Sequence, residues 1–481
     1  MPWKRYLVYF IAILVCVGGT LAVVYLNEQR EESYSFEEAG GVGGGVVGTP
    51  QQIPAAKTAW KDSAENQQEA NEGFSVAGLD QAQVKLAGQT VGADWPKFNG
   101  KNHDNISAES GLLQEWPSEG PKLLWTAKGL GAGYSGVSVV KGVVYTLTNK
   151  GPGECLLALD AGTGEKIWCT AFGPATNPSV GPGPRATPTI DGESAYGLGA
   201  DGLLVSANLE DGKIQWRKNI LQEFKGNNIT WGICESVLID GEKLICTPGG
   251  KEGTLVALDK RTGEKIWSCV VPEKDAAGYA SALVAEIAGV RQYVQFASRG
   301  TFGVSSEGEF LWRNDSAANG TANCSSPLVS GDFVFSASGY GQGGALVKLT
   351  PKEGGIDATL VYHTDDMKSH HGDMVVKDGL LFGSSDPGIL ACLDLVSGKV
   401  KWQNRSVGKG SVTCADGMLI LRSEKGPIAL VKAQGSKYEE LGRFDQPERS
   451  TQDAWTHPVV AADGRLFLRD QDILLCYDLK K

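Results

Sequence analysis

The side chains best suited to bind a ligand recur at one kind of position, just ahead of short hydrophobic runs that contain a turn signal. The set combines aromatic rings with Arg, Lys, His, Glu and Asn. Such groups suit a planar, anionic or hydroxyl-rich ligand, because arginine holds a carboxylate through paired hydrogen bonds and aromatic rings stack. The members are Tyr134, Arg185, Trp231, Glu235, Tyr279, Asn323, His370, His371, Lys409, Trp455 and His457. The alternative is that these side chains only fill a wet space at the centre of the fold.

The same set offers few groups for catalysis or metal binding. Glu235 and Asp373 are the candidates for a base that takes a proton from a hydroxyl group. His370 and His371 are adjacent, so on a regular strand they point to opposite faces and cannot hold one ion unless the backbone bends. The sequence has no nucleophile elbow, phosphate-binding loop or HExxH motif. We therefore assign no catalytic residue and predict no metal site.

An eleven-residue phrase repeats along the chain and predicts the elements that position these side chains. Residues 158–168 read A-x-D-x-x-T-G-x-x-x-W, and residues 257–267 repeat the phrase. A shortened copy spans 207–216, and a variant spans 392–402. Each copy predicts a strand, a tight glycine turn and a second strand that ends in tryptophan. Internal repeats of this kind indicate a propeller, a solenoid or an array.

A second series of turns gives the number of repeats. It consists of Lys141-Gly142, Asp191-Gly192, Asp240-Gly241, Ala288-Gly289, Ser330-Gly331, Asp378-Gly379, Asp416-Gly417 and Asp463-Gly464. Eight such turns imply eight units of two hairpins, and four-stranded units of this length are propeller blades. The last unit lacks a fourth strand, which residues 122–125 supply. We therefore predict an all-β, eight-bladed propeller whose N-terminal strand completes the C-terminal blade and removes an open edge.

The repeated tryptophans have a structural interpretation. An indole at the end of each fourth strand can wedge between neighbouring blades and bury a large apolar ring. This role is expected for Trp125, Trp168, Trp216, Trp267, Trp312 and Trp402.

The N-terminal residues have a composition unlike the repeats. Residues 6–26 are apolar, long enough for a membrane-spanning helix, and preceded by Lys4 and Arg5. The basic flank predicts a single-pass, uncleaved signal anchor over residues 1–26 with the rest of the chain on the periplasmic or other extracytoplasmic side. A cleaved signal peptide is the alternative. Residues 27–90 are rich in Gly, Glu, Gln and Asn and predict a flexible linker, and residues 91–481 form the propeller domain.

Charge and cysteine content limit the partners. The net charge of −11 argues against a nucleic-acid surface, which needs basic residues. Nine cysteines lie outside the anchor, and Cys234 with Cys246, or Cys155 with Cys169, flank turns nearly opposite each other. Either pair is a candidate cross-strand disulfide in an oxidising compartment, and the alternative is that all are buried free thiols.

The repeated phrase resembles the repeat of the pyrroloquinoline quinone (PQQ) superfamily. The resemblance covers roughly residues 94–481 and includes the stretches 94–100, 183–189, 246–251 and 469–472. The superfamily contains quinoprotein alcohol dehydrogenases, which hold PQQ and calcium in eight-bladed propellers, and non-enzymatic propellers such as BamB. Within it, the chain is similar to membrane-anchored bacterial PQQ-like repeat proteins. The dehydrogenases typically press two adjacent cysteines against the quinone, and this chain has no such pair.

The resemblance and the candidate ligand-binding residues together give three functional hypotheses. The first is a monomeric, membrane-anchored module that binds or scaffolds envelope proteins or a small ligand, without a firm cofactor. The second is a PQQ- and calcium-dependent dehydrogenase that oxidises an alcohol, a sugar or a polymer hydroxyl. The third is a carbohydrate-binding module in which Trp231, Tyr279 and Trp455 serve as stacking platforms.

Overall fold

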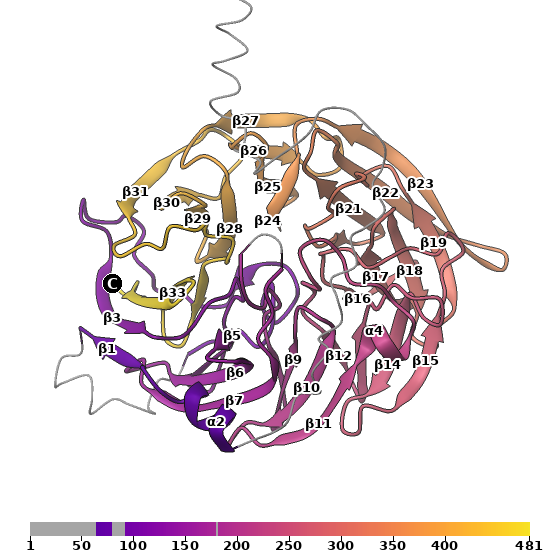
Figure 1. Cartoon of the computed structure of the whole chain (residues 1–481). Helices are drawn as coiled ribbons and strands as arrows, with labels where there is room; N and C mark the ends of the chain where they lie inside the picture. The colour runs from indigo at the N-terminus through magenta and orange to yellow at the C-terminus, as the bar shows by residue number, and fades with distance from the viewer. Residues whose placement is uncertain (1–63, 79–91, 179–180) are drawn as a thin grey trace, which may run out of the picture. The chain divides into compact units, whose positions relative to one another are not determined.

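Four-stranded antiparallel sheets repeat around a central axis in the computed structural model, which describes residues 64–78, 92–178 and 181–481 (Figure 1). Eight sheets form the blades of a propeller, as the turn count predicted. Blades 1 to 4 consist of β4 (Ser138–Val140), β5 (Val143–Lys150), β6 (Gly153–Asp160) and β7 (Lys166–Pro174); β8 (Thr189–Asp191), β9 (Ser194–Leu198), β10 (Leu203–Asn208) and β11 (Ile214–Asn219); β12 (Leu238–Asp240), β13 (Lys243–Cys246), β14 (Leu255–Asp259) and β15 (Lys265–Cys269); and β16 (Leu283–Ile287), β17 (Val290–Phe296), β18 (Thr301–Ser305) and β19 (Phe310–Asn314).

The second half of the ring follows the same plan. Blades 5 to 8 consist of β20 (Leu328–Ser330), β21 (Phe333–Ser338), β22 (Gly343–Lys352) and β23 (Gly355–Thr364); β24 (Ser369–Lys377), β25 (Leu380–Ser385), β26 (Ile389–Asp394) and β27 (Val400–Asn404); β28 (Gly410–Ala415), β29 (Met418–Ser423), β30 (Pro427–Lys432) and β31 (Glu440–Asp445); and β32 (Val459–Ala461), β33 (Arg465–Asp470), β34 (Ile473–Asp478) and β3 (Lys122–Lys128). A short strand, β2 (Ile106–Ser107), adds to blade 7 beside β28, and a short helix, α4 (Ile220–Glu223), follows blade 2.

The repeated phrase forms a turn that packs against a tryptophan of the preceding blade. In its first copy, the Asp160 carboxylate accepts hydrogen bonds of 2.8 Å from the backbone N–H groups of Gly162 and Thr163. Gly164 has a φ of +75°, and a Cβ atom on it would lie 2.6 Å from the Trp125 ring. The Trp125 indole N–H donates to the Ala161 carbonyl at 3.2 Å. The phrase therefore requires glycine for both its backbone angle and the contact with the tryptophan of the preceding blade.

The same joint connects most neighbouring blades. Each indole N–H donates to a carbonyl of the turn in the next blade, and the rings of Trp168, Trp216 and Trp267 also lie against the glycine of that turn. The donor–acceptor pairs are Trp168 with Leu209, Trp216 with Lys260, Trp267 with Ser306, and Trp402 with Gln434. In blade 5 a tyrosine takes this role, because the Tyr362 hydroxyl donates to the Leu395 carbonyl at 2.7 Å beside Gly398.

One joint departs from the pattern. The Trp312 indole N–H donates at 2.5 Å to the side chain of Gln292 in its own blade. The next blade has ten-residue strands β22 and β23 in a long hairpin, where the other blades have a short turn. Leu349 and Ile356 of that hairpin pack in the same apolar cluster as Trp312. The Trp312 indole therefore still lies between blades 4 and 5, but it packs with Leu349 and Ile356.

Ring closure follows the predicted scheme. Strand β3 pairs antiparallel with β34, with Trp125 opposite Cys476. Blade 7 has no tryptophan in its fourth strand, and Trp116 from the segment before β3 fills that place. Trp116 packs so closely on Gly442 that a Cβ atom added to this glycine would lie 2.5 Å from the Trp116 Cβ. The centroids of the Trp116 and Phe444 rings are 5.4 Å apart. The closing interface thus uses residues from both ends of the propeller sequence.

A segment of the expected linker docks on the propeller. Residues 64–78, which we call the N-terminal strap, form helix α2 (Ala64–Ala70) and strand β1 (Ser75–Ala77). Strand β1 pairs with β3, and α2 packs on β7 and β6 of blade 1. Composition did not predict these contacts, because the segment buries few of its own side chains and is ordered by two exposed strand edges.

The expected membrane anchor, residues 6–26, lies outside the described residues. Among the residues that the structure does describe, no helix has the length and apolar character needed to cross a bilayer. All nine cysteines of the described part are free thiols. Cys234 lies before the first residue of β12, and the pairing of β12 with β13 begins with Leu238 opposite Ile245. Cys234 and Cys246 are therefore not opposite each other across the two strands.

A glycine substitution tests the joint. We expect Gly212→Ala to lower the free energy of unfolding by about 1 to 3 kcal/mol more than Gly192→Ala. Both glycines have positive φ, but a Cβ on Gly212 would lie 2.7 Å from the Trp168 ring, whereas nothing lies within 4 Å of a Cβ on Gly192. Urea unfolding of both variants measures the difference. Equal destabilisation would show that backbone strain alone explains these glycines.

Candidate functional site

The predicted ligand-binding residues lie on one face of the ring. In a four-stranded antiparallel blade, the turn between the second and third strands lies at the same end as the loop that enters the next blade. These turns and interblade loops form what we call the loop face. The opposite face carries the hairpin turns of the repeated phrase, and we call it the turn face. An isolated bridge between Ala132 and Asn149, and a 3.0 Å hydrogen bond from Ala454 N–H to the Glu424 carbonyl, join loops to turns on the loop face.

The densest cluster on the loop face surrounds Glu424. Its Oε2 atom lies 3.1 Å from His371 Nε2 and accepts a hydrogen bond of 3.1 Å from the Trp455 indole. Burial opposes ionisation of Glu424, but the His371 hydrogen bond and charge, together with the Lys409 charge and the indole, lower its pKa to about 2. The carboxylate is therefore a fixed anion that ties blades 6, 7 and 8 together.

Tyr134 extends this cluster into blade 1. Its ring stacks on Trp455, with centroids 4.6 Å apart, and the Arg185 guanidinium lies 5.0 Å from the ring centroid. The tyrosine hydroxyl donates to the Gln452 side chain at 3.1 Å. The predicted stacking rings are thus used for contacts with one another.

His370 belongs to a second ionic group. Its Nδ1 atom lies 2.6 Å from Lys409 Nζ, which also pairs with Asp386 at 3.2 Å. Burial and the Lys409 charge lower the pKa of His370 to about 2, so the ring is neutral and accepts from the lysine. The register of β24 shifts between Ser369 and Met374, so the backbone bends and both histidines reach blade 7. They contact different partners there.

The remaining predicted residues lie apart from the Glu424 cluster. Trp231 and Tyr279 contact each other with centroids 5.4 Å apart, on blades 3 and 4. Asn323 donates to the carbonyls of Ala297 and Ser298 and serves as a loop anchor. His457 lies 5.0 Å from the Phe98 ring and 2.9 Å from the His371 carbonyl, and burial lowers its pKa to about 4.

The two candidate bases are engaged within the protein. The Glu235 carboxylate accepts from Thr247 N–H and, at 3.1 Å, from Gln295 of blade 4. The Asp373 carboxylate accepts from the Asn99 amide at 2.5 Å and from Ser326 N–H at 2.6 Å. Burial raises the pKa of each to about 7. They belong to different blades and stabilise separate blade contacts.

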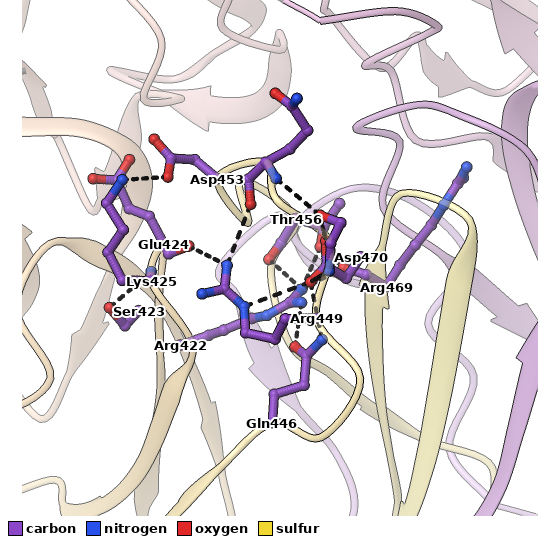
Figure 2. A network of polar contacts seen from close by, with 12 residues as sticks. Arg422, Ser423, Glu424, Lys425, Gln446, Arg449, Asp453, Thr456, Arg469 and Asp470 are labelled. Carbon is purple, nitrogen blue, oxygen red and sulfur yellow. Dashed lines mark hydrogen bonds and ion pairs between the residues drawn. The ribbon is translucent and has the colours of Figure 1, made fainter. Parts of the chain in front are cut away.

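Sequence reasoning missed a buried polar network beside the cluster (Figure 2). Arg422 is fully buried and donates to the Arg469 carbonyl at 2.6 Å and to Gln446 at 2.7 Å. Arg449 donates to the Glu424 carbonyl at 2.7 Å and pairs with Asp470 at 3.6 Å. Burial lowers the pKa of Arg422 to about 10, so the guanidinium stays charged at neutral pH. The network fixes the loop that carries Trp455.

The stretch 469–472 closes the ring at the loop face. Arg469 is buried, and burial lowers its pKa to about 9; it donates to Ser135 and Leu147 of the blade 1 region. Asp472 accepts from Gly131 N–H at 2.6 Å. Glu424, Asp386 and these residues all lie in or beside turns after a second strand. A position just after the second strand of a blade is therefore the sequence signal for these residues, whereas the predicted set came from positions ahead of the first strands.

These residues do not fit a quinone with calcium. Calcium takes six to eight oxygen ligands, so several carboxylates and carbonyls must converge on it. Here Glu235, Asp373 and Asp470 lie on blades 3, 6 and 8 and already accept hydrogen bonds from their neighbours. Within the described ranges, no three His, Cys, Asp or Glu side chains gather closely enough to hold a metal ion. We therefore derive no reaction step through a quinone or a metal.

Comparison with known proteins identifies a family. The family model described as outer membrane protein assembly factor BamB matches residues 99–230 and 152–404. A curated protein of that name from Shewanella oneidensis is 28% identical over 215 residues, which is 43% of this chain and 50% of the relative. The match therefore spans half the length of that relative.

The chain is similar to solved structures at low sequence identity. The quinohemoprotein alcohol dehydrogenase from Comamonas testosteroni is 13% identical, with a TM-score of 0.52 over 87% of this chain and 84% of that one. BamB from Moraxella catarrhalis is 14% identical, with a TM-score of 0.49 over 69% of this chain and 95% of that one. At such identity the dehydrogenase likeness shows the fold alone.

Opposite pKa shifts on the loop face predict opposite pH effects. Burial raises the pKa of Glu235 from 4.5 to about 7 in the folded protein, so the protein loses stability as pH rises from about 4.5 to 7. Glu235→Gln should flatten that loss, which is on the order of 1 to 3 kcal/mol. The hydrogen bond and charge of His371 outweigh burial and lower the pKa of Glu424 to about 2, so its stabilising effect is present above pH 4.5 and is lost as pH falls toward 2.

The measurement is urea unfolding of wild type, Glu235→Gln and Glu424→Gln between pH 3 and pH 8. Glu424→Gln is expected to destabilise the protein at pH 7 and to remove part of the loss below pH 4.5. Parallel pH curves for wild type and Glu235→Gln would contradict the raised pKa of Glu235.

Proposed function

The chain belongs to the family of the outer membrane protein assembly factor BamB, and on that basis we propose that it is a binding and scaffolding module of the bacterial envelope. In this proposal the loop face of the propeller receives another envelope protein, and the ring supplies a rigid platform. The expected anchor at residues 6–26 would hold the propeller on the extracytoplasmic side of a membrane.

The observation that carries the proposal is the internal pairing of the loop face. The Glu424 carboxylate pairs with His371 and Trp455. The charged side chains of the network beside it bond to one another and to loop backbone (Figure 2). Such contacts fix the shape of a surface without leaving a gathered set of free catalytic groups. A preformed surface favours association, because fewer side chains lose freedom when a partner binds.

The exposed groups on the same face suit a protein partner. Tyr340 keeps 46% of its surface exposed beside His370, and Arg299 and Thr230 are also exposed on this face. Tyrosine, tryptophan and arginine are enriched in protein interfaces and often carry most of the binding energy. Family membership makes a protein of outer membrane assembly the partner to test first.

The dehydrogenase and carbohydrate-binding hypotheses have less support. A quinone dehydrogenase needs groups that gather around a cofactor and a cation, and the buried carboxylates here lie on separate blades. A carbohydrate platform needs a free aromatic face, but Trp455 stacks on Tyr134 and Arg185 lies over the same tyrosine ring.

Site-specific photo-crosslinking tests the proposed surface. A benzophenone amino acid is placed, one position at a time, at Thr230, Arg299, Tyr340 or Gln452 of the full chain in living cells. We expect adducts with a protein of outer membrane assembly, identified by mass spectrometry, because these exposed positions lie on the loop face.

Matched positions on the turn face serve as controls. Glu210, Arg261 and Ser397 are exposed in the turns of the repeated phrase. We expect no such adduct from them. Equal adducts from both faces, or adducts from the loop face that contain no envelope protein, would overturn the proposal.

A further inference from the structure

Two thiols in blade 1 touch each other under the N-terminal strap. Cys155 on β6 and Cys169 on β7 are both buried, and their side chains are joined by a hydrogen bond. Both belong to the apolar cluster that includes Ala70 of α2. They are the pair that flanks the first copy of the repeated phrase.

The strand register differs from a direct cross-strand pair. Cys155 lies opposite Ala171 and Cys169 lies opposite Leu157, so the cysteines are diagonal neighbours. The register of β6 and β7 shifts between Glu154 and Cys155, and again between Ala158 and Leu159. Such bulges bend and twist the bulged strand, and here the thiols end in contact in spite of the offset.

The two thiols are chemically unequal. The hydrogen bond from Cys155 lowers the pKa of Cys169, and the charges of Lys166 and Lys150 lower it further. The same hydrogen bond, with burial, raises the pKa of Cys155. A thiolate next to a second thiol is the arrangement that reacts with oxidants and is then resolved to a disulfide.

The strap covers this pair through specific contacts. The Gln67 side-chain amide donates to the Ala171 carbonyl at 2.8 Å and its oxygen accepts from Ala171 N–H at 3.2 Å. Asn71 donates to the Cys169 carbonyl at 3.3 Å, and Lys166 donates to the Asn71 carbonyl at 2.7 Å. Helix α2 thus occupies the edge of β7 next to Cys169.

We propose that Cys155 and Cys169 form a redox site that closes to a disulfide when the N-terminal strap lifts from blade 1. Undocking α2 exposes Cys169 to a disulfide oxidant such as oxidised glutathione. The proposal does not rest on the function proposed for the loop face.

The reaction balances as two thiol–disulfide exchanges. The Cys169 thiolate attacks one sulfur of oxidised glutathione, forms a mixed disulfide and releases one glutathione thiolate. Cys155 then loses its proton to solvent and attacks the Cys169 sulfur, which releases the second glutathione. The sulfurs must move from hydrogen-bond contact to a bond of about 2.05 Å. The protein dithiol is oxidised by two electrons, and oxidised glutathione is reduced to two thiols.

Peptide mapping of the full chain tests the site. The purified, reduced protein is incubated with oxidised glutathione, alkylated and digested with trypsin without reduction. Cleavage after Lys150, Lys166 and Arg185 places the two cysteines on separate peptides, 151–166 and 167–185. We expect these peptides to be joined, and we expect Cys155→Ser to stop instead at a glutathione adduct on Cys169.

Two double variants of the strap test whether its release from blade 1 controls disulfide formation. Gln67→Ala with Asn71→Ala removes the contacts to β7 and should speed disulfide formation on the order of ten-fold, the effect of about 1.4 kcal/mol on the docking equilibrium. Gln68→Ala with Glu72→Ala is the matched control, because these side chains bond to each other at the exposed surface. It should leave the rate unchanged.

Three results would overturn the proposal. The first is no joined peptide in either wild type or the Gln67/Asn71 variant. The second is a stable glutathione adduct on Cys169 while Cys155 is present. The third is equal rates in both strap variants, which would show that release of the strap does not control disulfide formation. A failed crosslinking experiment at the loop face would leave all three outcomes unaffected.

Discussion

The contact between a tryptophan ring and a turn glycine is the constraint on which the rest of the ring depends. At four joints, from blade 8 round to blade 4, one blade supplies the indole and the next supplies the glycine and the carbonyl, so these blades are incomplete without their neighbours. Because the ring must lie flat on the turn, no side chain can stand at that glycine. The joint therefore fixes the distance between blades at the turn face, and the loops of the opposite face follow from it.

Closure of the ring uses different interactions on its two faces. At the turn face, Trp116 fills the place that a repeated tryptophan leaves empty in blade 7. At the loop face, Arg469 reaches from blade 8 into the blade 1 region, and Arg422 joins blade 7 to blade 8. A buried guanidinium is costly unless oxygen atoms surround it, so such residues fix one arrangement of the three blades. The N-terminal strap then covers the outer edges of the two blades that meet at the junction.

The same polar contacts are the basis for the proposal that the loop face binds a partner. Catalysis at neutral pH needs a group whose pKa and position leave it free to exchange a proton with a substrate. Glu424 is held ionised by its partners, and Glu235 and Asp373 are buried between blades. A family known for assembly of outer membrane proteins is consistent with a surface of this kind. The thiol pair under the strap lies on one hairpin, formed by β6 and β7 of blade 1.

The sequence alone determined the number of blades, their four strands and the closing role of residues 122–125, because turns and period-two strands are local and repeat. It also indicated which positions meet on one face. The tertiary structure decided how those side chains combine: Tyr134 stacks on Trp455 across the closing junction, and His370 and His371 take different partners after a bend in β24. It placed Glu424 at the centre of the cluster and docked residues 64–78 on two blade edges. These contacts join residues far apart in sequence, and each depends on the exact angle between blades, which no local pattern encodes.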